Sequence, residues 1–199
     1  MRKGFAVCAI VLALAGFVLA LLIWNGTILF NNPSKRVYPV RGVDVSAYQG
    51  EIDWPVLASQ DIQFAFIKAT EGSGFVDRNF AVNFAEARKT KLRVGAYHFF
   101  SFDSAGETQA DHFISVVPRI EGMLPPVVDF EFYGDKEKNR PDPDAARAQL
   151  NILLEALESH YGQKPIIYAT ERAYDAYLSG YYAGYDLWIR CLLYPSRCV

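Results

Sequence analysis

Three acidic residues stand at the ends of apolar, β-rich runs, where the functional groups of α/β proteins are usually found. Asp44 lies in the run of residues 42–46, and Asp129 and Glu131 lie in the run of residues 126–131. On an extended strand, residues i and i+2 project from the same face about 6.6 Å apart. The spacing therefore predicts that Asp129 and Glu131 share one cavity, with the acid of the first run as a third member of the site.

Two carboxyl groups in an apolar frame are suited to hydrolysis of a glycosidic bond. Burial and a neighbouring negative charge raise the pKa of one carboxyl, while the other stays ionised. The reaction needs that division, because a protonated acid must reach the leaving oxygen and a carboxylate must handle the oxocarbenium-like charge. The alternative is that these acids are helix caps or surface ion pairs. It is weaker for Asp129 and Glu131, which alternate with Val128 and Phe130, than for Asp44.

Strand and helix patterns alternate from residue 41 onward. Strands are expected at residues 42–46, 64–69, 93–100, 126–131, 165–169 and 186–190, and helices at about 79–89, 107–117 and 144–161. The last helix has one apolar stripe, a cap at Asp142 or Asp144 beside Pro143, and a stop at Gly162. The alternation predicts an α/β fold with a mostly parallel sheet, open or closed into a barrel. Both architectures place their sites at the C-terminal ends of the strands.

A long apolar segment precedes this pattern. Arg2 and Lys3 are followed by an uncharged run over residues 5–24, which as a helix would extend ~30 Å, enough to cross the hydrocarbon core of a bilayer. We expect a single-pass transmembrane anchor. The alternative is a cleaved signal peptide with its processing site near Ala13 to Ala15.

These boundaries divide the chain into an anchor or signal segment (residues 1–24), a polar linker (25–40) and one catalytic domain (41–199). The chain has 199 residues and a formal net charge of -2, so it carries no broad basic field for a nucleic acid partner.

The cysteines Cys8, Cys191 and Cys198 show no metal-site spacing, although a disulfide between the last two is conceivable outside the cytoplasm. We therefore expect no metal site. The oligomeric state is not legible in the sequence.

Several ordered motifs together resemble the family-25 glycoside hydrolases, the lysozymes first known from Chalaropsis fungi and many phages. The opening motif is RGVDVSAYQGEIDW. The others are FIKATEG, DRNFAVN, GAYHFF and VDFE, and the five motifs occupy residues 41–54, 66–72, 77–83, 95–100 and 128–131. The resemblance spans residues 41 to about 190.

This resemblance implies a modified (β/α) TIM-like barrel that cleaves the β-1,4 bond between N-acetylmuramic acid and N-acetylglucosamine in peptidoglycan, without a cofactor. Glu131 would be the general acid, and Asp129 would position the 2-acetamido group or stabilise the developing cation. Asp44 would orient water or tune the pair. Peptidoglycan glycan strands would be the partner, with the catalytic domain held outside the cytoplasm at the cell membrane, or secreted if the N-terminal segment is cleaved.

Other side chains near the predicted strand ends could contact the sugar. We expect Tyr97 to line the cleft. Tyr48, Phe99 and Tyr168 could form a sugar-stacking wall or belong to the core, and Glu71 could contact the substrate or cap a local turn.

Two further polar residues are expected to have structural roles. His98 lies on a strand without metal-ligand companions, so a hydrogen-bonded structural role is expected. Asp53, before Trp54 and Pro55, is predicted to cap a helix.

The C-terminal part departs from the family pattern. After residues 186–190 the chain runs into CLLYPSRCV, without the Trp-Gln-Tyr segment that the family resemblance implies. About 160 residues give six strands, whereas an eight-stranded barrel takes 200 or more. We therefore expect an incomplete barrel from a truncated or frame-shifted chain.

The competing function is a catalytically impaired glycan-binding module. A chitinase-like site is disfavoured because Val127 stands where that motif has an acid.

Overall fold

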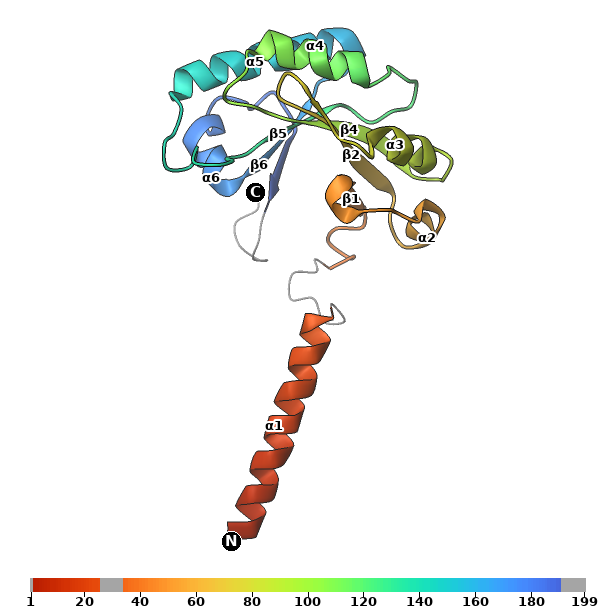
Figure 1. Ribbon diagram of the computed structural model, residues 1–199, viewed down its shortest axis with the longest axis vertical. Helices are drawn as coiled ribbons and strands as arrows, with labels where there is room; N and C mark the ends of the chain where they lie inside the picture. The colour runs from red at the N-terminus through yellow and green to blue at the C-terminus, as the bar shows by residue number, and fades with distance from the viewer. Residues whose placement is uncertain (1, 26–33, 191–199) are drawn as a thin grey trace.

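The computed structural model describes residues 2–25 and 34–190, and it places one α/β unit after an N-terminal helix (Figure 1). The elements, in chain order, are α1 (Arg2–Trp24), β1 (Gly42–Val45), the 3-10 turn η1 (Ala47–Gln49), α2 (Trp54–Ser59), β2 (Phe64–Glu71), β3 (Phe75–Val76), α3 (Phe80–Arg88), β4 (Arg93–Phe99), α4 (Gly106–Val116), β5 (Val127–Phe130), α5 (Pro143–Tyr161), β6 (Ile166–Thr170), α6 (Glu171–Ala173), the π-helical turn η2 (Tyr174–Leu178) and β7 (Leu187–Arg190).

The sheet is parallel along its main path. Its strand order is β1-β2-β4-β5-β6-β7, and the short β3 pairs antiparallel with β2. All six predicted strands are therefore confirmed, as is the α/β class. The sheet curls into half of a barrel, and within the described part of the chain neither β1 nor β7 pairs with a strand that would close it (Figure 1). The predicted TIM-like barrel is thus present as an incomplete one.

The two faces of the sheet differ because side chains alternate along each strand. The residues that enter the core lie under the helices, with α4 and α5 side by side across the top of Figure 1. On β5, Val128 and Phe130 belong to this core, and Asp129 projects from the opposite, inner face. The inner face is therefore the one on which the predicted acids can meet.

Helix ends follow the sequence signals closely. Asp142, not Asp144, caps α5, because its carboxylate accepts a hydrogen bond from Ala145 N at 2.9 Å, and Gly162 ends the helix in the left-handed conformation at φ 69°. Asp53 caps α2 by accepting from Val56 N at 3.0 Å, as predicted. These caps fix where each helix starts after its strand.

The N-terminal segment forms the expected helix, α1, but the expectation of a membrane span is not supported. None of the helices in residues 2–25 and 34–190 combines the length and apolar character required to cross a bilayer. Of the three cysteines, Cys8 is free and exposed on α1. Cys191 and Cys198 lie outside the described residues, so the disulfide that is conceivable between them is untested.

Candidate active site

The three predicted acids approach one another at the C-terminal edge of the sheet. Asp44 is the third residue of β1, Asp129 is the third residue of β5, and Glu131 lies one residue beyond the end of β5. Their charges interact, since Asp44 and Glu131 both raise the pKa of Asp129. Residues separated by more than 80 positions therefore meet through the parallel order of the strands, as the strand-end rule predicts.

Asp129 has the most perturbed environment of the three acids. Its side chain is buried, with the residue 9% exposed, and its Oδ1 atom has no hydrogen-bond partner. Burial, followed by the negative charge of Glu131, raises its pKa to about 8, although the charges of Lys68 and Arg190 oppose the rise. A carboxyl group with this pKa holds its proton at neutral pH.

Glu131 and Asp44 are more accessible, and each faces a cation. Arg190 Nη1, on strand β7, lies 3.4 Å from Glu131 Oε2. Burial raises the pKa of Glu131 even though Arg190 lowers it, and burial also raises the pKa of Asp44 against the pull of Arg190. The sequence predicted that one carboxyl of the Asp129 and Glu131 pair has a raised pKa and that the other stays ionised. In the structure both pKa values are raised, so the two acids differ only in the size of the shift.

Two of the predicted aromatic residues lie against the acids. Burial raises the pKa of Tyr97, and the charges of Asp129 and Asp44 add to the rise. Tyr168 pairs with Asp129 across β5 and β6, and its pKa is raised by burial and then by Glu131. Both phenols thus stay protonated and can donate hydrogen bonds to a ligand at the acids.

The other aromatic candidates are placed differently. Phe99 pairs with Asp129 across β4 and β5, and its ring packs at 5.9 Å from that of Tyr133. Tyr48, on the turn after β1, is 93% exposed, so it belongs neither to the core nor to a packed wall beside the acids.

Glu71 binds a lysine that the sequence prediction missed. Lys68 Nζ lies 2.7 Å from Glu71 Oε2 and 4.8 Å from the centre of the Phe99 ring, and its side chain is only 10% exposed. Its positive charge acts to lower the pKa values of Asp129 and Glu131. The signal was available, because Lys68 interrupts an otherwise apolar strand at an inward-facing position.

His98 has the structural role that was expected. It is fully buried on the helix-covered face, where Nδ1 lies 2.7 Å from Thr70 Oγ1 and Nε2 lies 3.1 Å from Gln109 Oε1. Because Gln109 Oε1 can only accept, Nε2 carries the proton and Nδ1 accepts from the Thr70 hydroxyl. Burial lowers the pKa of His98 to about 4, so the ring is neutral. Residues 2–25 and 34–190 contain no cluster of His, Cys, Asp or Glu able to hold a metal ion.

Comparisons with known proteins agree with this architecture. A family model described as glycosyl hydrolases family 25 matches residues 43–196. YegX of Escherichia coli (strain K12) is 36% identical over 157 residues, which cover 76% of this chain and 56% of that protein. The chain therefore spans little more than half the length of this relative.

Solved structures show the same likeness. A family 25 glycosyl hydrolase from Bacillus anthracis superposes with a TM-score of 0.77 at 55% sequence identity, over 77% of this chain and 71% of that one. A bacterial lysozyme from Streptomyces coelicolor superposes with a TM-score of 0.69 at 31% identity, over 75% of this chain and 73% of the lysozyme. The sequence, the fold and the acidic strand ends agree, and the chain belongs to glycosyl hydrolase family 25.

Proposed function

We propose that this chain is a lysozyme-type glycosidase that cleaves the β-1,4 bond between N-acetylmuramic acid and N-acetylglucosamine in peptidoglycan. The observation that carries the proposal is the pair Asp129 and Glu131 at the end of β5, both with raised pKa values, facing Asp44 on the inner face of the sheet. The similarity to the lysozyme from Streptomyces coelicolor supports the choice of substrate.

Glu131 is the general acid in this proposal. It lies beyond the last ladder residue of β5 and its side chain is 20% exposed, so it can reach an oxygen of a bound sugar. Its proton passes to the glycosidic oxygen as the bond from the anomeric carbon to that oxygen breaks. Arg190 then stabilises the carboxylate that remains.

Asp129 lies deeper and acts on the sugar that carries the developing positive charge. Its unpaired Oδ1 atom is free to accept a hydrogen bond from the 2-acetamido group or to face the cation. Asp44 orients the water that adds to the anomeric carbon, and the proton that this water releases returns to the Glu131 carboxylate. The hydroxyl groups of Tyr97 and Tyr168 hold the sugar between them.

The test is release of new reducing ends from purified peptidoglycan by the full chain and by the Glu131→Gln variant. Loss of the general acid lowers the rate on the order of 10²- to 10⁴-fold. Glu86→Gln is the matched control, because Glu86 is an exposed acid on α3 that pairs with Lys89. Borohydride reduction followed by hydrolysis identifies the new end, and muramitol is the product expected from the proposed bond. Equal rates for wild type and Glu131→Gln exclude this role for Glu131.

A glycan-binding module is the second candidate, and the open half-barrel favours it. The described sheet ends at β1 and β7 without closing, so part of the wall around the acids that a full barrel provides is not formed by residues 34–190. Such a protein binds insoluble peptidoglycan and releases no reducing ends. A pull-down with peptidoglycan, run beside the reducing-end assay, separates the two functions.

We also propose that the α/β unit works outside the cytoplasm, where its substrate lies. The support is the chemistry of the substrate alone. Cell fractionation followed by protease accessibility of the intact cell surface tests this location, and a chain protected from protease in intact cells and recovered with cytosolic proteins contradicts it.

A further inference from the structure

Glu131 lies beyond the backbone ladder of the sheet that carries Asp129, although Arg190 of β7 contacts its side chain. The ladder of β5 ends at Phe130, which pairs with Ala169 of β6, and Glu131 begins the segment 131–142 that leads to α5. A proposed general acid on a connecting segment needs other contacts to fix its position, because small displacements of a reacting group reduce the rate strongly.

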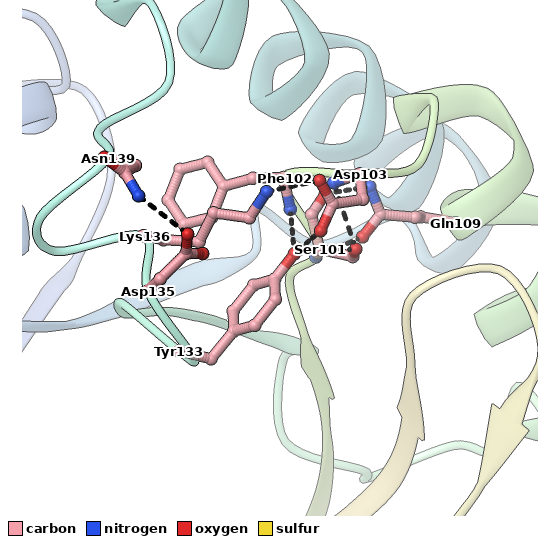
Figure 2. Close-up of polar contacts among 8 residues, drawn as sticks. All are labelled: Ser101, Phe102, Asp103, Gln109, Tyr133, Asp135, Lys136 and Asn139. Carbon is pink, nitrogen blue, oxygen red and sulfur yellow. Dashed lines mark hydrogen bonds and ion pairs between the residues drawn. The ribbon is translucent and has the colours of Figure 1, made fainter.

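Tyr133, two residues after Glu131, ties this segment to the loop that follows β4 (Figure 2). Its hydroxyl donates to Asp103 Oδ2 at 2.8 Å, accepts from Phe102 N at 3.0 Å and lies 3.1 Å from Ser101 Oγ. One hydroxyl group thus contacts three consecutive residues of the neighbouring loop.

Lys136 adds an ion pair to the same acceptor. Its Nζ lies 2.5 Å from Asp103 Oδ1, so the Asp103 carboxylate receives the ammonium on one oxygen and the Tyr133 hydroxyl on the other (Figure 2). These hydrogen bonds, that of Lys136 first, lower the pKa of Asp103. We call Asp103, Tyr133 and Lys136 the latch.

The loop on the far side of the latch is fixed to the core. Gln109 is fully buried on α4, its Oε1 accepts from Ser101 N at 2.7 Å, and its Nε2 donates to Ser101 O at 3.0 Å and to Ser104 O at 2.9 Å. His98 donates to the same amide oxygen. The latch therefore joins the segment of Glu131 to an immobilised support.

The ring of Tyr133 reaches the site as well. Its centre lies 5.9 Å from that of Phe99, which pairs with Asp129 in the sheet, and 5.9 Å from that of Phe102. The hydroxyl contacts and the ring contacts therefore both act through Tyr133, two residues after Glu131.

We propose that the latch positions Glu131 for proton donation, with Tyr133 as the residue through which it acts. The proposal rests on the proposed function. Tyr133 is a positioning residue, since it acts through Glu131 and not on the substrate.

Tyr133→Phe in the full chain tests the proposal, because it removes the hydroxyl and keeps the ring. We expect kcat on peptidoglycan fragments to fall on the order of 10- to 100-fold, with KM changed less than about 3-fold, since the variant displaces the acid without removing a sugar contact. Tyr182→Phe is the matched control. It removes a buried hydroxyl that donates to Asn151 Oδ1 at 2.9 Å on α5, and kcat should stay within about 2-fold. A Tyr133→Phe variant as active as the control overturns the proposal.

A double-mutant cycle separates positioning from general stabilisation. Once Glu131 is Gln, Tyr133→Phe should cost less than about 3-fold more, because the residue it positions no longer donates a proton. Multiplicative losses in the Glu131→Gln, Tyr133→Phe double variant overturn the proposal, since they would place Tyr133 outside the action of Glu131.

Hydrogen exchange tests the latch independently of activity. Amides of residues 131–136 should exchange on the order of 10-fold faster in Tyr133→Phe than in wild type, and as in wild type in Tyr182→Phe. Unchanged exchange overturns the latch even if wild type is active. A wild-type chain that releases no reducing ends contradicts the proposed function instead, and faster exchange in Tyr133→Phe would still support the latch.

Discussion

The two faces of the same sheet bury polar groups in opposite ways. On the helix-covered face, His98 is fully buried and both ring nitrogens have partners, Thr70 and Gln109. On the inner face, Asp129 is buried beside a second acid and its Oδ1 has no hydrogen-bond partner. A satisfied buried polar group contributes to a defined core, whereas an unsatisfied one costs stability and is usually found where function requires it.

His98 and Asp129 differ in the lone pairs and protons that they can still offer to a ligand. His98 is held neutral in one tautomer and has no free lone pair or proton to offer. Asp129 keeps both a proton at neutral pH and an unpaired oxygen, so it can respond to a ligand. Asn83 Nδ2 is the other unpaired buried side-chain atom within the described residues, but its amide has no pKa to shift. The combination of an unpaired atom with a raised pKa distinguishes the candidate site.

The largest expected effect is on the inner face. Asp129→Asn should lower kcat on the order of 10²- to 10³-fold, because an amide, unlike the carboxyl group, cannot release a proton to become the negative charge that stabilises a developing cation. The variant should be folded and at least as stable as wild type at pH 7, since it removes a buried ionisable group. Reducing-end release and thermal unfolding measure the two properties. A variant that is both active and destabilised would mean that Asp129 belongs with His98 as a structural residue.

A substitution on the helix-covered face should reverse this pattern. His98→Leu removes the side-chain partner of the Thr70 hydroxyl and one of the two donors to Gln109 Oε1, and it places an apolar group among buried polar ones, so we expect the free energy of unfolding to fall by about 2–4 kcal/mol. The rate per folded molecule should fall far less than in Asp129→Asn. Urea unfolding followed by circular dichroism gives the stability. A loss below about 0.5 kcal/mol would remove the distinction between the faces.

The pH dependence of stability should have opposite signs for the two groups. Folding raises the pKa of Asp129 from 3.8 to about 8, so the native state keeps a proton that the unfolded chain loses, and stability falls as pH rises through this range. Folding lowers the pKa of His98 from 6.5 to about 4, so the unfolded chain gains a proton first, and stability falls as pH drops from 6.5 to 4.

The two variants make this prediction measurable. The stability gain of Asp129→Asn over wild type should grow from pH 4 to pH 8, and the deficit of His98→Leu should shrink from pH 6.5 to pH 4. Each slope is at most about 1.4 kcal/mol per pH unit, the value for one proton. Thermal or urea unfolding at four or five pH values gives both slopes. Parallel slopes for the two variants would contradict the assignment of opposite shifts.

The sequence was sufficient for the six strands of the parallel path, for the helices α3, α4 and α5 and for the acids, because all of them leave local signals. The strand at residues 126–131 alternates apolar and acidic side chains, and Asp142 and Gly162 mark the ends of α5 directly. The strand-end rule then brings Asp44 to the pair without any knowledge of the contacts.

The contacts that tune the site could not be predicted from local patterns. Arg190 is 59 residues from Glu131, and Tyr133 is 30 residues from Asp103, so both pairs depend on the register and on loop paths. Strand β3 has two residues, which is too short for any periodic signal. Whether a tyrosine lines the site or packs in the core depends on its side-chain direction, and the structure brings Tyr97 and Tyr168 to the acids and leaves Tyr48 exposed.

The smallest expected effect concerns Arg190, which gives Glu131 the partner that Asp129 lacks. Arg190→Met should raise the pKa of Glu131 further and move the alkaline limb of the kcat profile upward by less than one pH unit. The shift is small because the arginine side chain is 45% exposed, so water and salt screen the pair. Arg172→Met, which removes the exposed pair with Glu137, is the control and should leave the limb in place.

Ionic strength sharpens the same measurement. Screening weakens the Arg190 and Glu131 pair in wild type. The alkaline limbs of the kcat profiles of wild type and Arg190→Met should therefore converge as the salt concentration rises from about 0.01 M to about 1 M. A limb that moves downward in Arg190→Met would mean that the arginine does not stabilise the carboxylate. Convergence would place Glu131 between Asp129 and His98 in the degree to which its polar atoms have partners. A carboxyl group that is only partly satisfied in this way can give up and regain a proton in each catalytic cycle.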